Sequence, residues 1–547
     1  MKTGFFRFQP VLIMIFALTS LCYPALSRAE NGGDLIQLFH PFPMHVNGAI
    51  SDDPAIASVS SQIFVSLLEV GSGRDFLPYL ASSWEVSEDG RTRTFHLQAG
   101  TVFHDGQPVT SGDVAFSYRT FRKYHPLGEQ MLSRVESVTT PDPGTFVMHL
   151  SQPDPALLFA LASPFMPILL RHVYEEDDIF GNPANFKAVG SGPFRVAEFH
   201  PGEGFTLERF DRFLRVGRPC LDRIIGRNGA SPEAVEKAFR EGRAHLATFL
   251  EDQEMIRRLP EINDLKVIVT GYESLGALNY LEFNLRKKPL QNLMVRQAIT
   301  HAIDLERISV TLYQGYALAQ VGPLPYNSRF YNHNLPLPDP DLEKANQLLD
   351  AAGFPRGEDK VRFTTRLTWK PDAAGLQKQL AAEIQTQLDR VGIRVELDPP
   401  PNEIEWVIQV SKWEHHMTLS RVFEWGDPLL TLHPLFSSKN VRHRIGANTA
   451  GFYSDQADVL LEAASIESEP GVRAGLYQQF QEVIVEELPL FFMHETPFVT
   501  AVNRRLQNFA TSGRGVIGPL DQVCWSEIRE TGVSGAGLWD SKMENTP

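Results

Sequence analysis

Three short segments of this chain carry residues that could do chemistry. His104 and Asp105 are adjacent in "FHDG", as a general base and its carboxylate partner could be. His415 and His416 are adjacent in "WEHHM", and imidazole is a common metal ligand. Ser534 lies among glycines in "GVSGAG", a composition shared with serine nucleophile motifs. Each segment has to be judged by the local structure that its neighbours predict.

The predicted local structure explains all three segments, and none of them needs a catalytic role. Asp105-Gly106 is a preferred turn pair, because glycine adopts positive φ easily. The two histidines of "WEHHM" would point to opposite faces of a strand, and they lack the H-E-x-x-H spacing of a zinc site. Ser534 lacks the strand–turn–helix setting of a nucleophile elbow. We therefore predict a turn at 104–106 and no catalytic residue, metal site or cofactor.

The elements around "FHDG" are well marked. Alternating residues predict strands at 84–86 and 92–97, joined by the turn pair Asp89-Gly90. Thr110 and Asp113 have the spacing of a capping box and predict the start of a helix. The segment therefore predicts a hairpin, a turn and a capped helix in succession.

The second half of the chain is predicted to be mostly helix followed by strand, which is typical of an α/β protein. Apolar residues at helical intervals predict a helix within 295–308. Asp339 is the expected N-cap of the next helix and Gly353 its C′ residue. A later helix is expected to end at Gly392 and to lead into a strand at 393–397.

Residues 1–29 have the three-part layout of a secretory signal peptide. A basic start and an apolar stretch precede "SRA", whose small residues suit cleavage near Ala29. The unbroken apolar core is shorter than the ~20 residues that a membrane span needs. Leu21 precedes Cys22 where a lipoprotein has a small residue. We therefore predict a mature protein that is exported, soluble and not inserted in a membrane.

The mature chain would be acidic and would keep two cysteines. Without residues 1–29 it has 48 basic and 66 acidic residues, a formal charge of −18. This balance argues against nucleic acid or an anionic membrane as a partner. Cys220 and Cys524 remain, and either a disulfide or two separately buried thiols would suit an exported protein.

Four segments, in order along the chain, closely resemble family 5 extracytoplasmic solute-binding proteins, the peptide- and nickel-type binding components of ABC importers. The first is "LASSWEVSEDGRTRTFHLQAGTVFHDGQPVTSGDVAFSY", at 80–118. The second is "GSGPFRVAEFHPGEGFTLERFDRF", at 190–213, and the third is "FNLRKKPLQNLMVRQAITHAID", at 283–304. The fourth combines "GFYSDQADVLLEAA" and "YQQFQEVIVEELPLFF". The resemblance extends in order along nearly the whole mature chain.

The resemblance implies a two-lobed α/β periplasmic binding protein fold of the type II kind, with an extra α/β domain inserted in the first lobe. It implies three sets of residues: lobe I at 30–60, 187–280 and 497–547; the inserted domain at 61–186; and lobe II at 281–496. Cys220 and Cys524 would then share lobe I, which favours the disulfide.

The resemblance also implies a ligand site between the lobes. Asp427, in "WGDP", matches the position where peptide-binding members hold the ligand's α-ammonium, although an aspartate before proline also suits a turn. Trp425 and Phe423 could line the cleft or belong to the core. Arg421 could take a ligand carboxylate or phosphate. Dipeptide-type members tend to have an arginine where this chain has Lys378 and Gln379, which weakens a simple dipeptide assignment.

The function that follows is transport without catalysis. We expect a periplasmic monomer that captures a small peptide, or a peptide-like or opine-like compound, and closes on it. The closed form would deliver it to the membrane-embedded permease of an ABC importer. The alternatives are a secreted hydrolase using the histidines above, or a haem- or metal-complex-binding protein.

Overall fold

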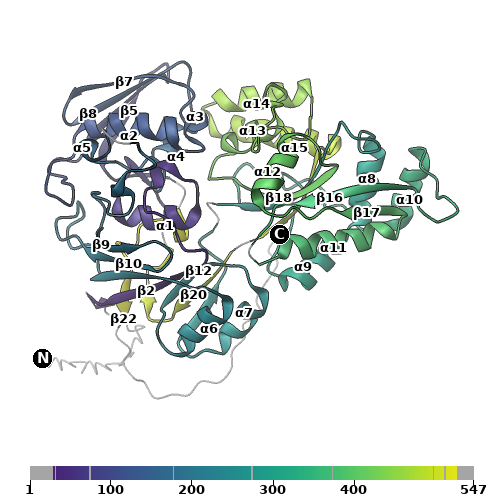
Figure 1. The fold of residues 1–547 in the computed structure, drawn as a ribbon. Helices are drawn as coiled ribbons and strands as arrows, with labels where there is room; N and C mark the ends of the chain where they lie inside the picture. Colours follow the sequence, from purple (N-terminus) through teal and green to yellow (C-terminus); the bar gives the residue numbers. More distant parts are fainter. Residues whose placement is uncertain are drawn as a thin grey trace, which may run out of the picture.

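The computed structural model describes residues 29–30, 32–72, 75–175, 178–272, 275–372, 374–496, 498–510 and 513–526. The expected signal peptide lies outside the described residues, except for Ala29, which begins the short strand β1 (Ala29–Glu30). Three sheets of four or more strands form three regions of the molecule (Figure 1). We call them the first-lobe sheet, the inserted-domain sheet and the second-lobe sheet. They give the mixed α/β architecture that the sequence predicts.

The first-lobe sheet has seven strands in the order β13-β20-β12-β2-β11-β10-β9. Its central strand, β2, is parallel to both of its neighbours, whereas the outer pairs are antiparallel. The strands are β2 (Asp34–Phe39), β9 (Phe194–His200), β10 (Gly204–Arg209), β11 (Arg223–Asn228), β12 (Leu246–Leu250), β13 (Leu265–Ile268) and β20 (Val499–Asn503). The lobe also carries α1 (Pro54–Ile63), α6 (Pro232–Arg240) and α7 (Gln253–Arg258).

The inserted-domain sheet is an antiparallel sheet in the order β5-β6-β8-β7, and the helix α2 (Ser111–Tyr124) lies with it (Figure 1). Its strands are β5 (Ala81–Val86), β6 (Thr92–Leu97), β7 (Val135–Asp142) and β8 (Thr145–Leu150). The predicted hairpin is confirmed, with Gly90 at φ 69° in its turn. The capping box is confirmed too, because the Thr110 amide donates to the Asp113 carboxylate at 3.0 Å.

The second-lobe sheet has the order β15-β19-β14-β18-β16-β17. All seven residues of β14 are buried, as expected for a strand with neighbours on both sides and layers on both faces. Its strands are β14 (Ala277–Phe283), β15 (Leu318–Ala319), β16 (Phe363–Trp369), β17 (Ile393–Leu397), β18 (Met417–Phe423) and β19 (Leu490–Glu495). Because β14 begins at 277 and runs past 281, the expected boundary of lobe II falls inside a strand, and the exact domain limits remain a prediction.

The helices that accompany the second-lobe sheet are α8 (Leu293–Ala302), α9 (Leu305–Tyr313), α10 (Leu342–Ala351), α11 (Leu376–Asp389), α12 (Glu403–Ser411), α13 (Leu432–Phe436), α14 (Asp455–Ile466) and α15 (Pro470–Glu487). Two sequence predictions about them are wrong in detail. The helix expected within 295–308 is two helices, because Asp304 caps a new one by accepting from the Arg307 amide. The N-cap of α10 is Asp341, not Asp339.

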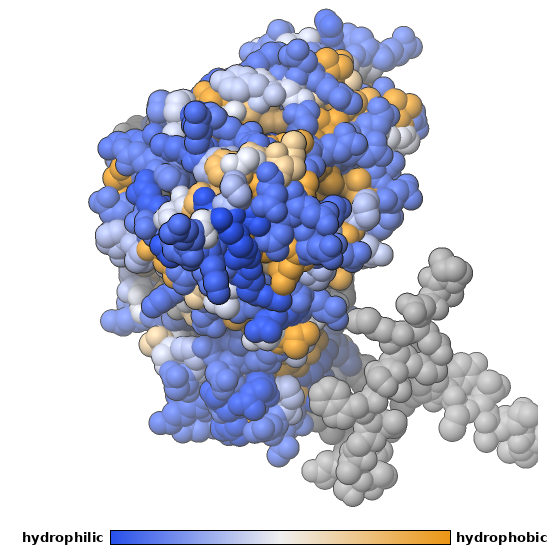
Figure 2. Space-filling model, turned by 90° about the vertical axis from the view of Figure 1, so that its right-hand side faces the viewer, coloured by the Kyte–Doolittle hydropathy of each residue, from blue (hydrophilic) through white to orange (hydrophobic). Residues whose placement is uncertain are grey.

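The surface turned outward by the second lobe is mostly hydrophilic, with hydrophobic residues in separate smaller areas (Figure 2). No helix of the described residues is long and apolar enough to cross a membrane. Cys220 and Cys524 form a disulfide that joins positions 304 residues apart, so the alternative left open by the sequence is resolved in favour of pairing. The bond fastens the C-terminal strand β22 (Cys524–Ser526) to the segment before β11.

Candidate functional site

A cavity of about 390 Å³ lies between the first and second lobes. The ends of β2 and β12 and the first turns of α1 and α7 form its first-lobe wall. The end of β18 and the segment after β16 form its second-lobe wall. This volume lies within the range of ~300–1,000 Å³ that is typical of small-molecule sites.

Four phenylalanines form the apolar part of the cleft. Phe39 and Phe249 come from the first lobe, Phe423 comes from β18, and Phe498 lies beside β20 where the chain passes between the lobes. The rings of Phe249 and Phe498 are 5.3 Å apart, and those of Phe423 and Phe498 are 6.3 Å apart. Such a cluster can bury the apolar part of a solute.

Phe249 has an unusual backbone for a bulky residue, with φ at 59°. Its amide donates to the Tyr272 hydroxyl at 2.9 Å, and that hydroxyl lies 2.6 Å from the hydroxyl of Thr500. The pairing of β12 with β20 also shifts register between Ala247 and Leu250. A local irregularity of this kind redirects side chains at a strand end and is frequent at functional sites.

The two walls are joined by an ion pair. Arg421 of β18 donates from Nη1 to the Glu251 carboxylate at 2.6 Å, and its Nε lies 3.4 Å from the Asn279 side-chain oxygen. Burial lowers the pKa of Arg421, but the Glu251 carboxylate, together with Tyr313 and Asp372, raises the pKa above its usual value. The Arg421 guanidinium also lies 5.2 Å from the ring centre of Phe498.

The polar groups behind Arg421 are held firmly. Asn279 is fully buried and donates to the Thr496 hydroxyl at 2.8 Å. Its side-chain oxygen accepts from Gln377 at 3.0 Å. Asp372 accepts from the first two amides of α11 and so fixes the start of the helix that carries Gln377. Arg421 is therefore presented to the cleft by a rigid support.

Two aspartates of the first-lobe wall cap helices. Asp53 accepts from the Ala55 amide at 2.7 Å, and Asp252 accepts from the Met255 amide at 2.7 Å. In each case the oxygen Oδ1 makes the bond. On the opposite wall, Lys370 pairs with Glu403 at 2.9 Å. The cleft thus presents charges of both signs beside aromatic rings.

Of the four residues predicted for the site, Arg421 and Phe423 line this cleft, whereas Trp425 and Asp427 do not. Trp425 packs between Phe423 and Phe165 of the inserted domain, with ring centres 5.4 Å apart in both cases. Its carbonyl accepts from Arg514 at 3.0 Å. Trp425 therefore belongs to the packing between the inserted domain and the second lobe.

Asp427 is fully buried, and both of its oxygens accept from Arg473 at 2.7 Å. Burial lowers the pKa of Arg473, but the Asp427 carboxylate raises it well above its usual range. Asp427 also caps the short turn after it by accepting from the Leu429 amide at 3.0 Å. The carboxylate therefore has a structural partner within the second lobe and no place in the cleft wall.

His104 and His415 make structural contacts, and Nδ1 of His416 lies 3.4 Å from the Thr365 hydroxyl. The turn at 104–106 is confirmed, because the Gly106 amide donates to the Phe103 carbonyl. His104 accepts from the Gly190 amide and lies 3.1 Å from the Gly192 carbonyl, which fastens the turn to the following segment. Burial lowers the pKa of His104 to about 4. His415 is buried against Glu282 at 3.0 Å.

Sequence reasoning missed Glu251, Asp53, Asp252, Lys370 and Phe249. The segments "SDDPAI" and "LEDQEM" do carry helix-capping signals, which could have marked the aspartates as helix starts. Asp252 lies in the cleft because α7 begins just beyond the end of β12, whereas Asp53 comes 14 residues after the end of β2. Nothing local in the sequence indicates that Glu251 meets Arg421, 170 residues away.

Two α/β lobes with a lined cleft between them define a binding protein that encloses a small solute. The chain belongs to the bacterial extracellular solute-binding proteins, family 5, whose model matches residues 75–443. It captures a solute outside the cytoplasm and works with an ABC importer. This confirms the resemblance and the fold class predicted from the sequence.

Relatives of known function are similar over most of their length. Heme-binding protein A of Haemophilus influenzae is 27% identical over 83% of this chain and 86% of its own. Glutathione-binding protein GsiB of Pectobacterium atrosepticum is 26% identical over 84% of this chain and 88% of its own. The dipeptide-binding protein of Escherichia coli K12 is 25% identical over 78% of this chain and 82% of its own.

Solved structures give the same fold. The Helicobacter pylori periplasmic binding protein DppA, in complex with the peptide STSA, has a TM-score of 0.76 and 25% identity. The alignment covers 91% of this chain and 99% of DppA. The binding protein AgaA of A. tumefaciens R10, in complex with agropinic acid, has a TM-score of 0.73 and 25% identity. The alignment with AgaA covers 91% of this chain and 99% of AgaA.

Proposed function

We propose that this protein binds a small peptide, or a peptide-like or opine-like compound, in the cleft between its lobes. The observation that carries the proposal is the combination of both charge signs with four phenylalanines in one cavity. A zwitterionic solute with an apolar part matches such a lining. Relatives that bind a dipeptide, glutathione and agropinic acid support this ligand class.

In this proposal Arg421 takes a carboxylate of the solute, and Phe423 packs against its apolar part. Asp53 and Asp252, rather than Asp427, take the ammonium group of the solute in this proposal. These two line the cleft, while Asp427 is paired with Arg473. Each cleft aspartate uses Oδ1 to cap its helix. The second oxygen of each can accept from an ammonium without loss of the cap.

We further propose that the protein acts in the periplasm as a monomer after cleavage of its signal peptide near Ala29. The disulfide between Cys220 and Cys524 suits an oxidising compartment outside the cytoplasm. Mass spectrometry of the exported protein would show its first residue, and light scattering its mass. A retained residue 1, or a dimer at micromolar concentration, would contradict this proposal.

The test of the ligand class is native mass spectrometry of protein purified without denaturation, followed by thermal unfolding with added compounds. We expect the cleft to retain a compound with a carboxylate and an amine, and glutathione, Ala-Ala or a short peptide to raise the unfolding temperature. A retained porphyrin, visible by its absorbance, with no response to peptides would contradict the proposal. Peptide hydrolysis would instead support the hydrolase alternative.

A further inference from the structure

The ion pair between Arg421 and Glu251 connects two parts of the protein that must separate. Glu251 follows β12 of the first lobe, and Arg421 lies in β18 of the second. A second contact crosses nearby, since the Gln314 side chain donates to the Gln253 carbonyl at 2.7 Å. A solute enters a two-lobed protein only when the lobes open, so both contacts have to break during each cycle.

Glu251 uses the same guanidinium that a solute would need. Arg421 donates from Nη1 to Glu251 and points Nε toward Asn279, and the two charged side chains are 16% and 25% exposed. This is the bond that a solute carboxylate would make with an arginine. The protein's own carboxylate therefore lies in the position of a ligand group.

We propose that Glu251 is a built-in competitor of the solute. It holds the lobes together through Arg421 when no solute is bound, and an anionic group of the solute replaces it upon binding. This inference rests on the proposed function, in which Arg421 takes a solute carboxylate. Glu251 is then a specificity-determining residue. A solute with an anionic group can replace Glu251 at Arg421, whereas a solute without one cannot.

The support of each partner favours such an exchange. Asn279 and its neighbours hold Arg421 in place whether or not Glu251 is bound. Glu251 instead lies at the end of a strand with a register shift, directly before the helix α7. Glu251 is partly exposed, so water can hydrate its carboxylate when the solute displaces it. The free-energy cost of the displacement is therefore low.

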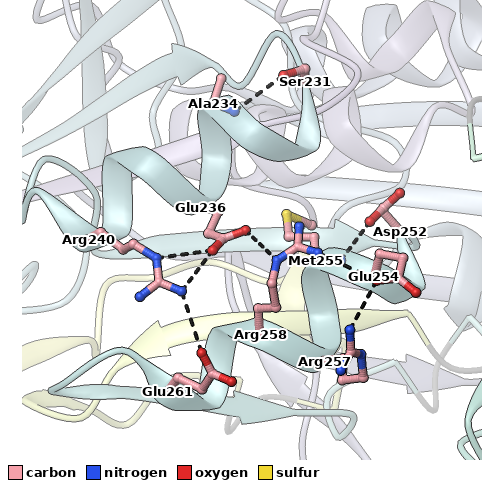
Figure 3. A network of polar contacts seen from close by, with 10 residues as sticks. All are labelled: Ser231, Ala234, Glu236, Arg240, Asp252, Glu254, Met255, Arg257, Arg258 and Glu261. Carbon is pink, nitrogen blue, oxygen red and sulfur yellow. Dashed lines mark hydrogen bonds and ion pairs between the residues drawn. The ribbon is translucent and has the colours of Figure 1, made fainter.

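A matched control lies one turn along α7. Glu254 also forms ion pairs, with Arg257 at 3.2 Å and Arg258 at 3.6 Å, but both partners belong to the same helix (Figure 3). The figure shows that the network continues through Glu236 to Arg240 and Glu261 within the first lobe. Glu254→Gln thus removes the same charge and breaks ion pairs, although longer and more exposed ones, without touching the second lobe.

The first measurement is small-angle X-ray scattering of protein freed of solute by unfolding, dialysis and refolding. We expect Glu251→Gln to increase the radius of gyration, because the lobes lose their ionic connection. Arg421→Gln is expected to produce the same increase, while Glu254→Gln matches the parent. Equal radii for the parent and both Glu251→Gln and Arg421→Gln would overturn the inference, whatever the solute is.

The second measurement is calorimetric titration with glutathione, Ala-Ala and Ala-Ala amide. We expect Glu251→Gln to bind a carboxylate-bearing probe roughly ten-fold more tightly, since one charge-assisted competitor is gone. Ala-Ala amide should gain little, and Arg421→Gln should bind the carboxylate probes weakly. Weaker binding by Glu251→Gln would overturn the inference. If no probe binds the parent, the proposed ligand class fails and the scattering result decides the inference alone.

Discussion

The ion pair between Asp427 and Arg473 allows a test of whether Asp427 stabilises the fold or binds the solute. Asp427 is fully buried and Arg473 has a side-chain exposure of 3%, and two bonds of 2.7 Å join them. Asp427→Asn keeps a side-chain oxygen that can cap the Leu429 amide, but it removes the charge and replaces the acceptor of the Arg473 Nη1 bond with a donor. It leaves the Arg473 guanidinium buried without a counter-charge.

The magnitude follows from this geometry. Removal of one partner of a buried ion pair costs about 3–5 kcal/mol, because the remaining charge stays desolvated. Arg473 cannot move into water easily, since its Nε donates to the Ala464 carbonyl at 2.9 Å and Phe330 and Tyr477 flank it. We therefore expect Asp427→Asn to lower the free energy of unfolding by about 3–5 kcal/mol.

The assay is urea-induced unfolding followed by circular dichroism, combined with solute titration of the folded protein. The double variant Asp427→Asn/Arg473→Met should recover most of the stability, because no uncompensated charge remains. Both variants should bind the solute as the parent does once they are folded. Loss of binding by Asp427→Asn at unchanged stability would refute this reasoning and return the ammonium site to Asp427.

Three further predictions concern the rest of the fold. The double variant Cys220→Ser/Cys524→Ser should lose about 5–6 kcal/mol in denaturant unfolding, since a cross-link over 304 residues removes much chain entropy from the unfolded state, and a loss below about 1 kcal/mol would contradict this. Burial lowers the pKa of both His104 and His494 to about 4, so the unfolded chain takes up more protons than the folded one below about pH 6.5. Stability should therefore fall as the pH drops from 6.5 to 4, and a flat profile of unfolding free energy would be inconsistent with these buried neutral imidazoles. Phe423→Ala should weaken solute binding about ten-fold or more in calorimetry through lost apolar contact, and unchanged affinity would remove Phe423 from the site.

The sequence predicts local structure well where the signals are local. The hairpin around Asp89-Gly90, the turn after His104 and the capping box of Thr110 all depend on residues within a few positions of one another. The break at Asp304 was missed because apolar residues keep helical spacing across it. The extended backbone at Ile303 and Asp304 and the carboxylate bond to the Arg307 amide show that a second helix begins there.

The site was harder to predict, because its contacts join distant segments. Arg421 and Phe423 could be proposed from a family-like segment, and both line the cleft. The same segment predicts Asp427 as a ligand residue, and nothing near Asp427 in the sequence indicates its pairing with Arg473, 46 residues further on. Glu251 could not be found without the arrangement of the two lobes, which brings the end of β12 in one sheet close to β18 in the other.

The strand order of the first-lobe sheet has a consequence for biogenesis. The strand β20 comes from near the end of the chain, yet it lies between β12 and β13, and β2 comes from near the beginning. Strand β12 pairs with both of them, so the lobe cannot complete its hydrogen bonding until β20, which begins 460 residues after the end of β2, has been made. A chain with such non-local pairing folds slowly. The disulfide between Cys220 and Cys524 joins positions 304 residues apart and then closes the completed lobe.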